Sequence, residues 1–235
     1  MSQTLLVTGA SGQLGRAVLS HLQGTLKVDA GRIVAVSRKV EALSDVAARG
    51  VTVRAGDFDD PASLDRAFAG ASPLLLISTH SIEGGKRLGQ HLNAVAAAER
   101  AGVRHVVYTS IPEAEASAVS FAPDHAGTEK AIRESRIPGF TILRNAWYFE
   151  NVRYGAPSAV QSGRWYTAAG DGALSHIARN DLALAAAHAL AADRNDRATF
   201  TLTGERGYTT ADIAKLVSAR LGSPIEVVQV SSEDL

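Results

Sequence analysis

A glycine-rich segment near the N-terminus constrains the fold of this chain more than any other feature. The segment, GASGQLG at residues 9–15, follows an apolar run at residues 5–8 and precedes an amphipathic stretch. A glycine pattern alone is common, but a strand before it and a helix after it are typical of a dinucleotide-binding βαβ unit. In such a unit Gly9 permits the tight turn, Gly12 lets the backbone approach a pyrophosphate, and Gly15 lets the helix pack closely on the sheet. The alternative interpretation is a plain tight turn between a strand and a helix.

Short apolar runs alternate with longer amphipathic runs through residues 1–145. The runs that predict strands are residues 4–8, 32–37, 51–54, 74–78, 105–109 and 140–143, and those that predict helices are residues 13–22, 40–49, 63–68, 86–101 and 129–135. The strand runs carry few charges, as parallel strands buried on both faces do. Asp60 directly before Pro61 is typical of a helix N-cap followed by proline at the first helical position. The alternation predicts an α/β fold with a Rossmann-type doubly wound parallel sheet.

The chain changes character after residue 145. Residues 145–163 are aromatic and irregular, and the later patterns predict helices at 181–191 and 210–221 and strands at 199–203 and 224–230. We therefore predict a nucleotide-binding domain over residues 1–145 and a small, closely packed α/β lobe over residues 146–235 that contributes to substrate binding. Residues 231–234 resemble the start of another helix, so a truncated lobe and a frayed end are both open interpretations.

Composition excludes several classes of protein and site. Hydrophobic residues make up 46% of the chain, enough for a sizeable core, and 24 basic residues balance 24 acidic ones, which gives no indication of a nucleic acid or anionic membrane partner. The absence of cysteine excludes disulfides and thiolate sites. The first residues lack the pattern of a signal peptide, and the apolar runs are too short for a membrane span. We expect a cytoplasmic protein; the sequence does not indicate its oligomeric state.

The end of the second predicted strand indicates which dinucleotide is bound. That strand ends in Ser37, Arg38 and Lys39, where NAD-binding chains carry an acidic residue for the ribose 2′-hydroxyl. Arginine suits a 2′-phosphate, because its planar fork forms paired, charge-assisted hydrogen bonds. We therefore predict NADPH as the cofactor, with NADH less favoured. The alternative is a pair of solvated cations at the start of a helix.

Further cofactor contacts are predicted at the carboxyl ends of other strands. Asp57 and Phe58, after the third strand, are expected beside the adenine, and Ser78 and Thr79, after the fourth, near the nicotinamide half. His80 comes next and is a candidate substrate residue. The predicted cofactor set is Gly9, Ser11, Gly12, Gln13, Leu14, Arg38, Asp57, Phe58, Ser78, Thr79 and Lys130.

Several segments together resemble a known family. They are the glycine loop, Arg38, GDF at 56–58, the strand at 74–78, YTS at 108–110, TEK at 128–130 and LRNAWYFEN at 143–151. They resemble the NmrA-like atypical short-chain dehydrogenases, and within them the bacterial NAD(P)H quinone oxidoreductase type 2 and triphenylmethane dye reductase group. The resemblance implies a Rossmann domain with a smaller C-terminal lobe, reduction of quinones or cationic dyes by NADPH, and a hydrogen bond from Lys130 to the nicotinamide ribose.

The chain lacks the usual acid of short-chain dehydrogenases, a tyrosine four residues before a lysine. None of the five tyrosines has lysine at that offset, and Ala126 stands four residues before Lys130. Alcohol chemistry needs a positioned acid or base, whereas hydride addition to a quinone leaves a phenolate that solvent can protonate, with a pKa near ~10 as in tyrosine. The predicted reaction is hydride transfer from NADPH to quinones or similar electron-poor planar acceptors.

The remaining candidates surround that reaction. Lys130 and Tyr148 are the catalytic candidates, and the predicted substrate residues are His80, Asn145, Trp147 and Tyr148. The two aromatic side chains are expected to stack on a flat substrate or else to pack in a core, and Asn145 to anchor a substrate oxygen or else to form a turn. No metal site is expected, and structural or surface roles are predicted for the other histidines, namely His91, His105, His125 and His188.

Two further functions remain open. One is a non-enzymatic regulator that senses NADP(H), as some NmrA-like proteins do. The other is a sugar-nucleotide epimerase or reductase, which the missing tyrosine–lysine pair makes less favoured. Oxidation of NADPH in the presence of benzoquinone distinguishes an enzyme from a sensor.

Overall fold

The computed structural model describes residues 3–81 and 83–234 and divides into two compact units. The first comprises residues 1–145 and 180–201, and the second comprises residues 146–179 and 202–235. The chain leaves the first unit after Asn145, where the sequence changes character, and later returns to it. The outer ends of the two predicted parts, residues 1–2 and 235, lie outside the described residues.

A seven-stranded sheet forms the centre of the first unit. Its strands are β1 (Leu5–Val7), β2 (Ile33–Ser37), β3 (Thr52–Ala55), β4 (Leu74–Leu76), β5 (His105–Ser110), β6 (Gly139–Asn145) and β9 (Arg197–Leu202), in the order β3-β2-β1-β4-β5-β6-β9. Strands β1 to β6 pair in parallel, with Val7 of β1 beside Ala35 of β2 and Leu75 of β4. The strand order reverses between β1 and β4, which confirms the doubly wound prediction and places the switch point there.

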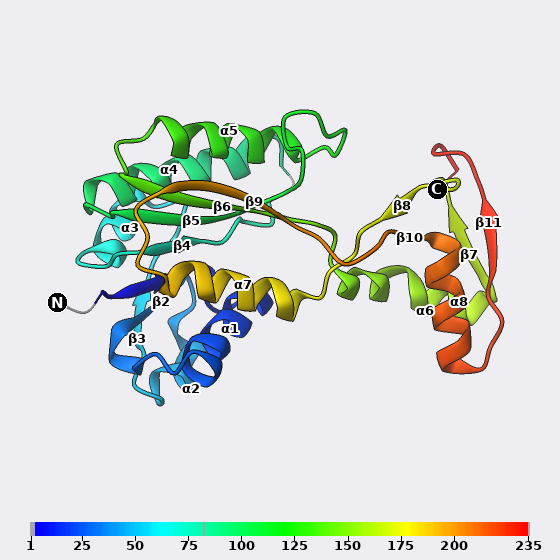
Figure 1. Cartoon of the computed structure of the whole chain (residues 1–235), viewed down its shortest axis with the longest axis horizontal. Coiled ribbons are helices and arrows are strands. Elements are labelled where there is room, and N and C mark those ends of the chain that lie inside the picture. Colours follow the sequence, from blue (N-terminus) through cyan, green and yellow to red (C-terminus); the bar gives the residue numbers. More distant parts are fainter. Residues whose placement is uncertain (1–2, 82, 235) are drawn as a thin grey trace. The chain divides into compact units, whose positions relative to one another are not determined.

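Helices cover both faces of this sheet. They are α1 (Gln13–Ser20) with a π-helical extension η1 (His21–Thr25), the 3₁₀ turns η2 (Ala30–Arg32) and η3 (Val40–Leu43), α2 (Ser44–Ala47), α3 (Pro61–Phe68), α4 (Lys86–Arg100), α5 (Ala122–Glu134) and α7 (Arg179–Ala191). Figure 1 shows α3, α4 and α5 on one face and α1, α2 and α7 on the other. His21 Nε2 lies 2.9 Å from Asn180 Oδ1, a contact that joins η1 to α7.

The core of the first unit lies between the sheet and its helices. Its central strands are buried along their whole length, whereas the edge strand β3 is partly exposed. Tyr108 and Phe68 are the largest of the fully buried side chains. Continuous burial of β1, β2 and β4 explains why their sequences are almost wholly apolar without alternation.

The second unit contains short elements. They are η4 (Phe149–Asn151), α6 (Val152–Ser162), β7 (Arg164–Thr167), β8 (Ala173–Leu174), β10 (Tyr208–Thr209), α8 (Thr210–Leu221) and β11 (Glu226–Gln229). Strand β7 pairs in parallel with β11, and β8 pairs antiparallel with β10. Helix α8 begins with a capping box, in which Thr209 accepts from the Asp212 N–H and Asp212 accepts from the Thr209 N–H.

Two helices differ from the sequence prediction. Helix α5 begins at Ala122, seven residues before the predicted start, because Pro123 falls in its first turn, where proline is tolerated. Helix α6 occupies part of the segment predicted as irregular and contains Pro157. A side chain at Gly155 would lie 3.1 Å from Trp165, so α6 packs closely on β7, and this packing overrides the low helix propensity of glycine and proline.

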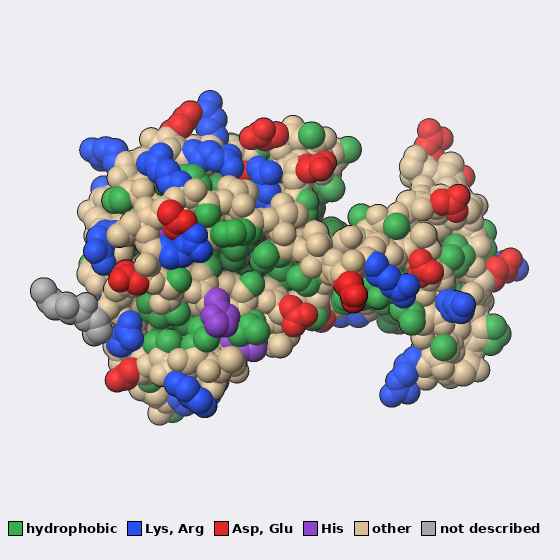
Figure 2. All heavy atoms as spheres, in the orientation of Figure 1, with side chains coloured by type: hydrophobic (Ala, Val, Ile, Leu, Met, Phe, Trp, Pro, Cys, Tyr) green, Lys and Arg blue, Asp and Glu red, His purple; other side chains and the backbone are tan. Residues whose placement is uncertain are grey.

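Charged side chains lie mainly on the surface, and basic and acidic groups both spread over the face shown in Figure 2. Among the described residues, the lysine, arginine, aspartate and glutamate side chains classed as buried are Arg87, with 6% of its surface exposed, and Glu129, with 0%. Both lie in the first unit, and both take part in the hydrogen-bond networks described below. Within the described chain, no helix is both long and apolar enough to cross a membrane.

The N-cap of α3 supports a first prediction. Asp60 accepts hydrogen bonds from the backbone N–H groups of Ala62 and Ser63 at 3.1 and 3.3 Å, and Pro61 follows it as the sequence indicates. We expect Asp60→Ala to lower the free energy of unfolding by about 1 kcal/mol, whereas Asp60→Asn should stay near the wild type, because both side chains cap well. Urea unfolding measures both variants, and an unchanged stability of Asp60→Ala would contradict the capping role.

Candidate cofactor-binding site

The glycine loop joins β1 to α1 at the switch point of the sheet. Gly9 has φ of +59°, and a side chain added there would lie 3.4 Å from Ile77, at the end of β4. The Gly12 N–H donates to the Gly9 carbonyl at 3.0 Å, and Gly12 is the N-cap of α1. In the described structure no side chain caps this helix, so its first N–H groups are available to an anion.

Gly15 holds α1 close to the loop. A side chain added at Gly15 would lie only 2.8 Å from the Ala10 Cα, a separation that real side chains do not adopt. The Ala10 N–H in turn donates to the Val36 carbonyl of β2 at 3.1 Å. The structure therefore confirms the close-packing role predicted for Gly15.

The glycine loop contacts the end of β2 directly. The Ser37 hydroxyl lies 2.9 Å from the Ser11 hydroxyl, and it also accepts from the Lys39 N–H at 3.1 Å. Arg38, which lies between Ser37 and Lys39 in the sequence, is exposed, and Lys39 is exposed as well. The structure thus brings two segments of the predicted cofactor set together, the loop at Ser11 and the cation at Arg38.

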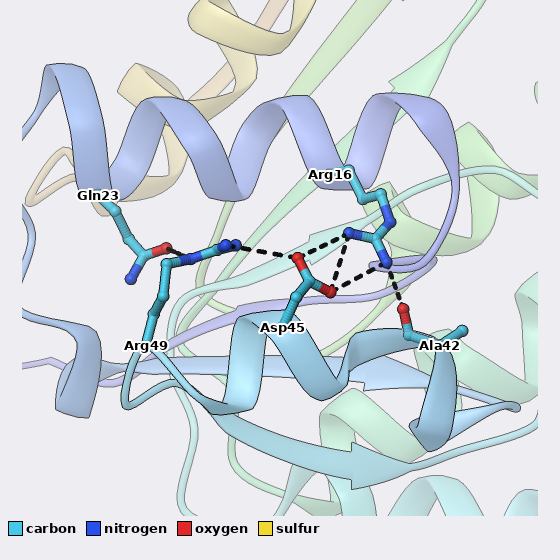
Figure 3. Close-up of polar contacts among 5 residues, drawn as sticks. All are labelled: Arg16, Gln23, Ala42, Asp45 and Arg49. Atoms are coloured by element: carbon cyan, nitrogen blue, oxygen red, sulfur yellow. Dashed lines mark hydrogen bonds and ion pairs between the residues drawn. The ribbon is translucent and has the colours of Figure 1, made fainter.

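An arginine on α1 holds the segment that follows Arg38. Arg16 donates through Nη1 to both oxygens of Asp45, at 3.2 Å each, and through Nη2 to the Ala42 carbonyl (Figure 3). Arg49 also reaches Asp45, at 3.4 Å, and donates to Gln23. The Arg16 hydrogen bond, together with both arginine charges, lowers the pKa of Asp45 against the opposing effect of burial. This network fixes η3 and α2 against α1.

The loop after β3 is held by its own backbone contacts. The Asp57 N–H donates to the Ser63 hydroxyl at 2.9 Å, and the Asp57 carboxylate accepts from the Asp59 N–H at 3.0 Å. Phe58 belongs to the hydrophobic core, with 9% of its surface exposed, and its carbonyl accepts from Asn93. Asp57 is half-buried at the sheet edge, whereas the Phe58 side chain serves the core.

The loop after β4 carries Ser78, Thr79 and His80. The Ser78 N–H donates to the Thr109 hydroxyl at 2.9 Å, and the Thr79 N–H donates to His91 Nε2 at 3.0 Å. The Thr79 hydroxyl is buried and has no hydrogen-bond partner in the described structure. His80 is exposed. A buried hydroxyl without a partner, beside the switch point, has an unused hydrogen bond to offer a ligand.

Lys130 lies apart from the other predicted cofactor residues. Its side chain is 73% exposed, and its ammonium lies 3.9 Å from the carboxylate of Glu134, on the outer side of α5. It lines a shallow surface groove together with Glu115 and Arg133. This is the placement of a surface helical lysine, so the geometry gives no support to the predicted hydrogen bond with the ribose or to a catalytic role.

Glu129, one residue earlier, points inward and joins three elements. Arg144 of β6 donates to its two oxygens at 2.9 and 2.6 Å, Ser110 of β5 donates at 2.7 Å, and Arg133 of α5 donates at 3.0 Å. Burial alone would raise the pKa of Glu129, but these partners outweigh burial and lower it. The sequence segments at 128–130 and 143–145 are therefore linked by a buried ion pair.

The last predicted residues follow this ion pair along the chain. Asn145 ends β6 and is buried, and its side-chain oxygen has no partner among the described residues. In the second unit, 47% of the Trp147 surface is exposed, and the Arg179 guanidinium lies 5.2 Å from the centre of the Tyr148 ring. The Ile177 N–H donates to the Trp147 carbonyl, which fixes this segment within its unit.

The structure also shows buried polar residues to which the sequence analysis gave no functional role. Arg87, His91, Tyr108, His125 and Thr128 form one hydrogen-bonded cluster between α4, β5 and α5, in which the Tyr108 hydroxyl lies near both histidines. The sequence carried one signal for this cluster, because the spacing of residues 125, 128 and 129 puts them on one face of a helix. That signal was missed because the helix was predicted to begin at residue 129. Among the described residues, no group of histidine and acidic side chains is arranged to hold a metal ion.

The glycine loop, the uncapped N-terminus of α1 and the switch point define a dinucleotide-binding protein of the Rossmann class. The chain belongs to the NmrA-like family, whose sequence profile matches residues 1–235. It is 38% identical to quinone oxidoreductase 2 of Escherichia coli, over 98% of this chain and 79% of that protein.

Solved structures of similar proteins agree with this family. Triphenylmethane reductase of Citrobacter sp., in complex with NADP(H), superimposes with a TM-score of 0.91 at 41% identity, over 97% of this chain and 80% of that one. The NADPH-dependent quinone oxidoreductase of Escherichia coli, in complex with NADPH, gives a TM-score of 0.91 at 38% identity, over 97% and 79% of the two chains. The predictions of family and fold are confirmed.

The buried carboxylate at Glu129 predicts a pH-dependent stability. The pKa of Glu129 is lowered in the folded state, so its contribution to the free energy of unfolding is complete at pH values above its unfolded pKa of about 4.3. That contribution is lost as the pH falls through the folded-state pKa. We expect Glu129→Gln to lower the free energy of unfolding at pH ~7 by roughly 3 kcal/mol, the lower end for a broken buried pair, because both arginines reach solvent. The difference from wild type should shrink below about pH 4.

Urea unfolding at several pH values measures this effect, with Glu134→Gln as the control, because Glu134 is exposed on the same helix. That control should change little at any pH. A Glu129→Gln effect that stays constant from neutral to acid pH would show that the charge of Glu129 is not what stabilises the fold.

Proposed function

We propose that this chain is an NADPH-dependent oxidoreductase that reduces quinones or similar electron-poor planar acceptors. The observation that supports the proposal is the hydrogen bond between Ser11 of the glycine loop and Ser37 at the end of β2. Arg38, the next residue, would then reach the phosphate of the cofactor, and this strand end carries no competing carboxylate. The similar structures from Citrobacter sp. and Escherichia coli, in complex with NADP(H) and NADPH, support the choice of cofactor. The cytoplasm, which maintains a reduced NADPH pool, is the compartment we propose.

The residues of the first unit fit a dinucleotide. Gly12 leaves the N-terminus of α1 open, and the tight turn at Gly9 keeps side chains away from the switch point. Arg38 would hold the 2′-phosphate, Asp57 would lie toward the adenine, and the hydroxyl of Thr79 would serve the nicotinamide half. When bound, NADPH supplies the hydride, and the protein orients the two reactants and excludes water.

We infer the substrate class from the side chains of α5, in which Ala126 occupies the position of the usual tyrosine acid. The inward face of α5 carries a pair with the spacing of the missing tyrosine and lysine, namely His125 and Glu129. Glu129 is held by arginines, and His125 is neutral, with a pKa lowered by burial to about 4. Neither is prepared to give a proton at neutral pH, so acceptors that need no obligatory protein acid fit best. The activities of the similar quinone oxidoreductase and triphenylmethane reductase support the same class.

Asn145, Trp147 and Tyr148 are the residues we propose for substrate contact. The side-chain oxygen of Asn145 lacks a partner in the described structure and would accept a hydrogen bond, while the two aromatic rings offer flat surfaces for stacking. The experiment that tests the function is the rate of NADPH oxidation with benzoquinone and with a cationic triphenylmethane dye. Tight NADPH binding without oxidation in the presence of either acceptor would instead indicate a cofactor-sensing regulator.

Arg38 should decide between the two dinucleotides. We expect Arg38→Ala to weaken NADPH binding by about tenfold to a hundredfold, since a lost charged hydrogen bond is worth ~1.5–3 kcal/mol, and to change NADH binding little. Cofactor fluorescence titration measures both affinities. The control is Arg100→Ala, which removes an exposed arginine that pairs with Asp65. Equal losses for both cofactors in Arg38→Ala would refute the phosphate role.

Tyr148 tests whether a protein acid takes part. We expect Tyr148→Phe to retain the rate of hydride transfer to benzoquinone within about threefold, because it keeps the ring and removes only the proton donor, and Tyr148→Ala to weaken substrate binding. Single-turnover kinetics measure the transfer step separately from binding. A loss of about a hundredfold or more in Tyr148→Phe would make Tyr148 a general acid and overturn the proposed chemistry.

A further inference from the structure

The buried cluster between α4, β5 and α5 ends at the loop that follows β4. His91, with 0% of its surface exposed, places Nε2 3.0 Å from the Thr79 nitrogen and Nδ1 2.8 Å from the Thr128 hydroxyl. A backbone N–H can only donate, so His91 Nε2 is an unprotonated acceptor, and the neutral ring carries its proton on Nδ1. The Thr128 hydroxyl accepts a hydrogen bond from that N–H and donates one to the Asp124 carbonyl at 2.7 Å.

The same argument fixes the second histidine. Arg87 Nη1 lies 3.2 Å from His125 Nε2, and a guanidinium can only donate, so this nitrogen is also an acceptor. His125 Nδ1 then donates to the Tyr108 oxygen at 2.8 Å. Arg87 further donates through Nε to the Ser81 carbonyl at 3.0 Å, and its guanidinium lies 4.7 Å from the centre of the Phe121 ring.

The electrostatics of the cluster agree with these assignments. Burial, followed by the charges of His125 and Arg87, lowers the pKa of His91 to about 3. Burial and Arg87 likewise lower the pKa of His125 to about 4. Both rings therefore stay neutral at the pH at which the protein works, and each has one donor and one acceptor in use. The Tyr108 oxygen lies 3.4 Å from His91 Nδ1, so it accepts a second, longer hydrogen bond from the same N–H that Thr128 accepts.

The loop held in this way begins beside the glycine loop. His91 holds the Thr79 N–H, and Arg87 holds the Ser81 carbonyl, so the segment is fixed at two points two residues apart. At its start, the Ile77 N–H donates to the Thr8 hydroxyl at 3.0 Å, and Ile77 packs against Gly9. The hydroxyl of Thr79 is left without a partner in the described structure.

We propose that His91 is a positioning residue for the nicotinamide half of the bound dinucleotide. Through Nε2 it sets the backbone at Thr79 and so fixes where the unpartnered hydroxyl of Thr79 hydrogen-bonds the cofactor. The proposal rests on the proposed function for the presence of the dinucleotide. His91 lies on α4, outside the glycine loop and the strand ends, and it acts on the cofactor through the loop at residues 78–81.

Two substitutions at His91 separate positioning from packing. The amide oxygen of glutamine reaches the place of Nε2, so His91→Gln keeps the acceptor for the Thr79 N–H, whereas His91→Met keeps the volume and removes the acceptor. Binding of NADPH is compared with binding of 2′,5′-ADP, a fragment with the adenine and 2′-phosphate but no nicotinamide. We expect His91→Met to weaken NADPH about tenfold and 2′,5′-ADP less than about twofold, and His91→Gln to restore NADPH affinity to within about threefold.

Several results would overturn the proposal. Equal weakening of both ligands in His91→Met would indicate a general structural role, and unchanged NADPH affinity would show that the acceptor is not used. If His91→Met does not fold, His91→Gln and the ¹⁵N shifts of the wild-type rings decide, because a proton on His91 Nε2 contradicts the assignment. Wild-type protein that binds 2′,5′-ADP but not NADPH would refute the proposed function itself rather than the role of His91.

Discussion

The buried ion pair between Glu129 and Arg144 is the interaction on which the carboxyl edge of the sheet depends most. It joins α5 to the last residues of β6, and Ser110 adds the end of β5 to the same carboxylate. A buried charge is costly unless its hydrogen bonds are complete, and Glu129 has four donors. Because Arg144 is fixed in this way, Asn145 after it is held at the point where the chain enters the second unit.

Parallel pairing supplies the other constraint. All six strands from β1 to β6 end at one edge, so segments far apart in the sequence meet there without a dedicated motif. The hydroxyls of Ser11 and Ser37 and the backbone at Thr79 show how polar contacts then fix each loop against a neighbour. The proposed cofactor site is therefore a consequence of strand order combined with a few short side chains that join adjacent loops.

Local patterns predicted much of this arrangement, since the apolar runs, the cap at Asp60 and the glycine loop each depend on neighbouring residues alone. The inward face of α5 was not predictable in the same way. The role of Lys130 was inferred from the family resemblance, and because successive residues of a helix point about 100° apart, Lys130 is exposed while its neighbour Glu129 is buried. Arg38, by contrast, is an exposed side chain directly after β2, so locating the end of that strand in the sequence was enough to predict its position. The partners of His91 are Thr79 after β4, Tyr108 of β5 and Thr128 of α5, which sequence spacing alone does not bring together.

The first unit is discontinuous in the sequence, and this has a consequence for biosynthesis. Its last strand, β9, and the helix α7 follow a segment of 34 residues, 146–179, that belongs to the second unit. A nascent chain can therefore form β1 to β6 early, but the edge of β6 stays unpaired until residues 197–202 leave the ribosome. An open edge of an apolar sheet is a surface on which other chains can pair. During translation, this edge is where the growing protein is most exposed to aggregation and where a chaperone would be of most use.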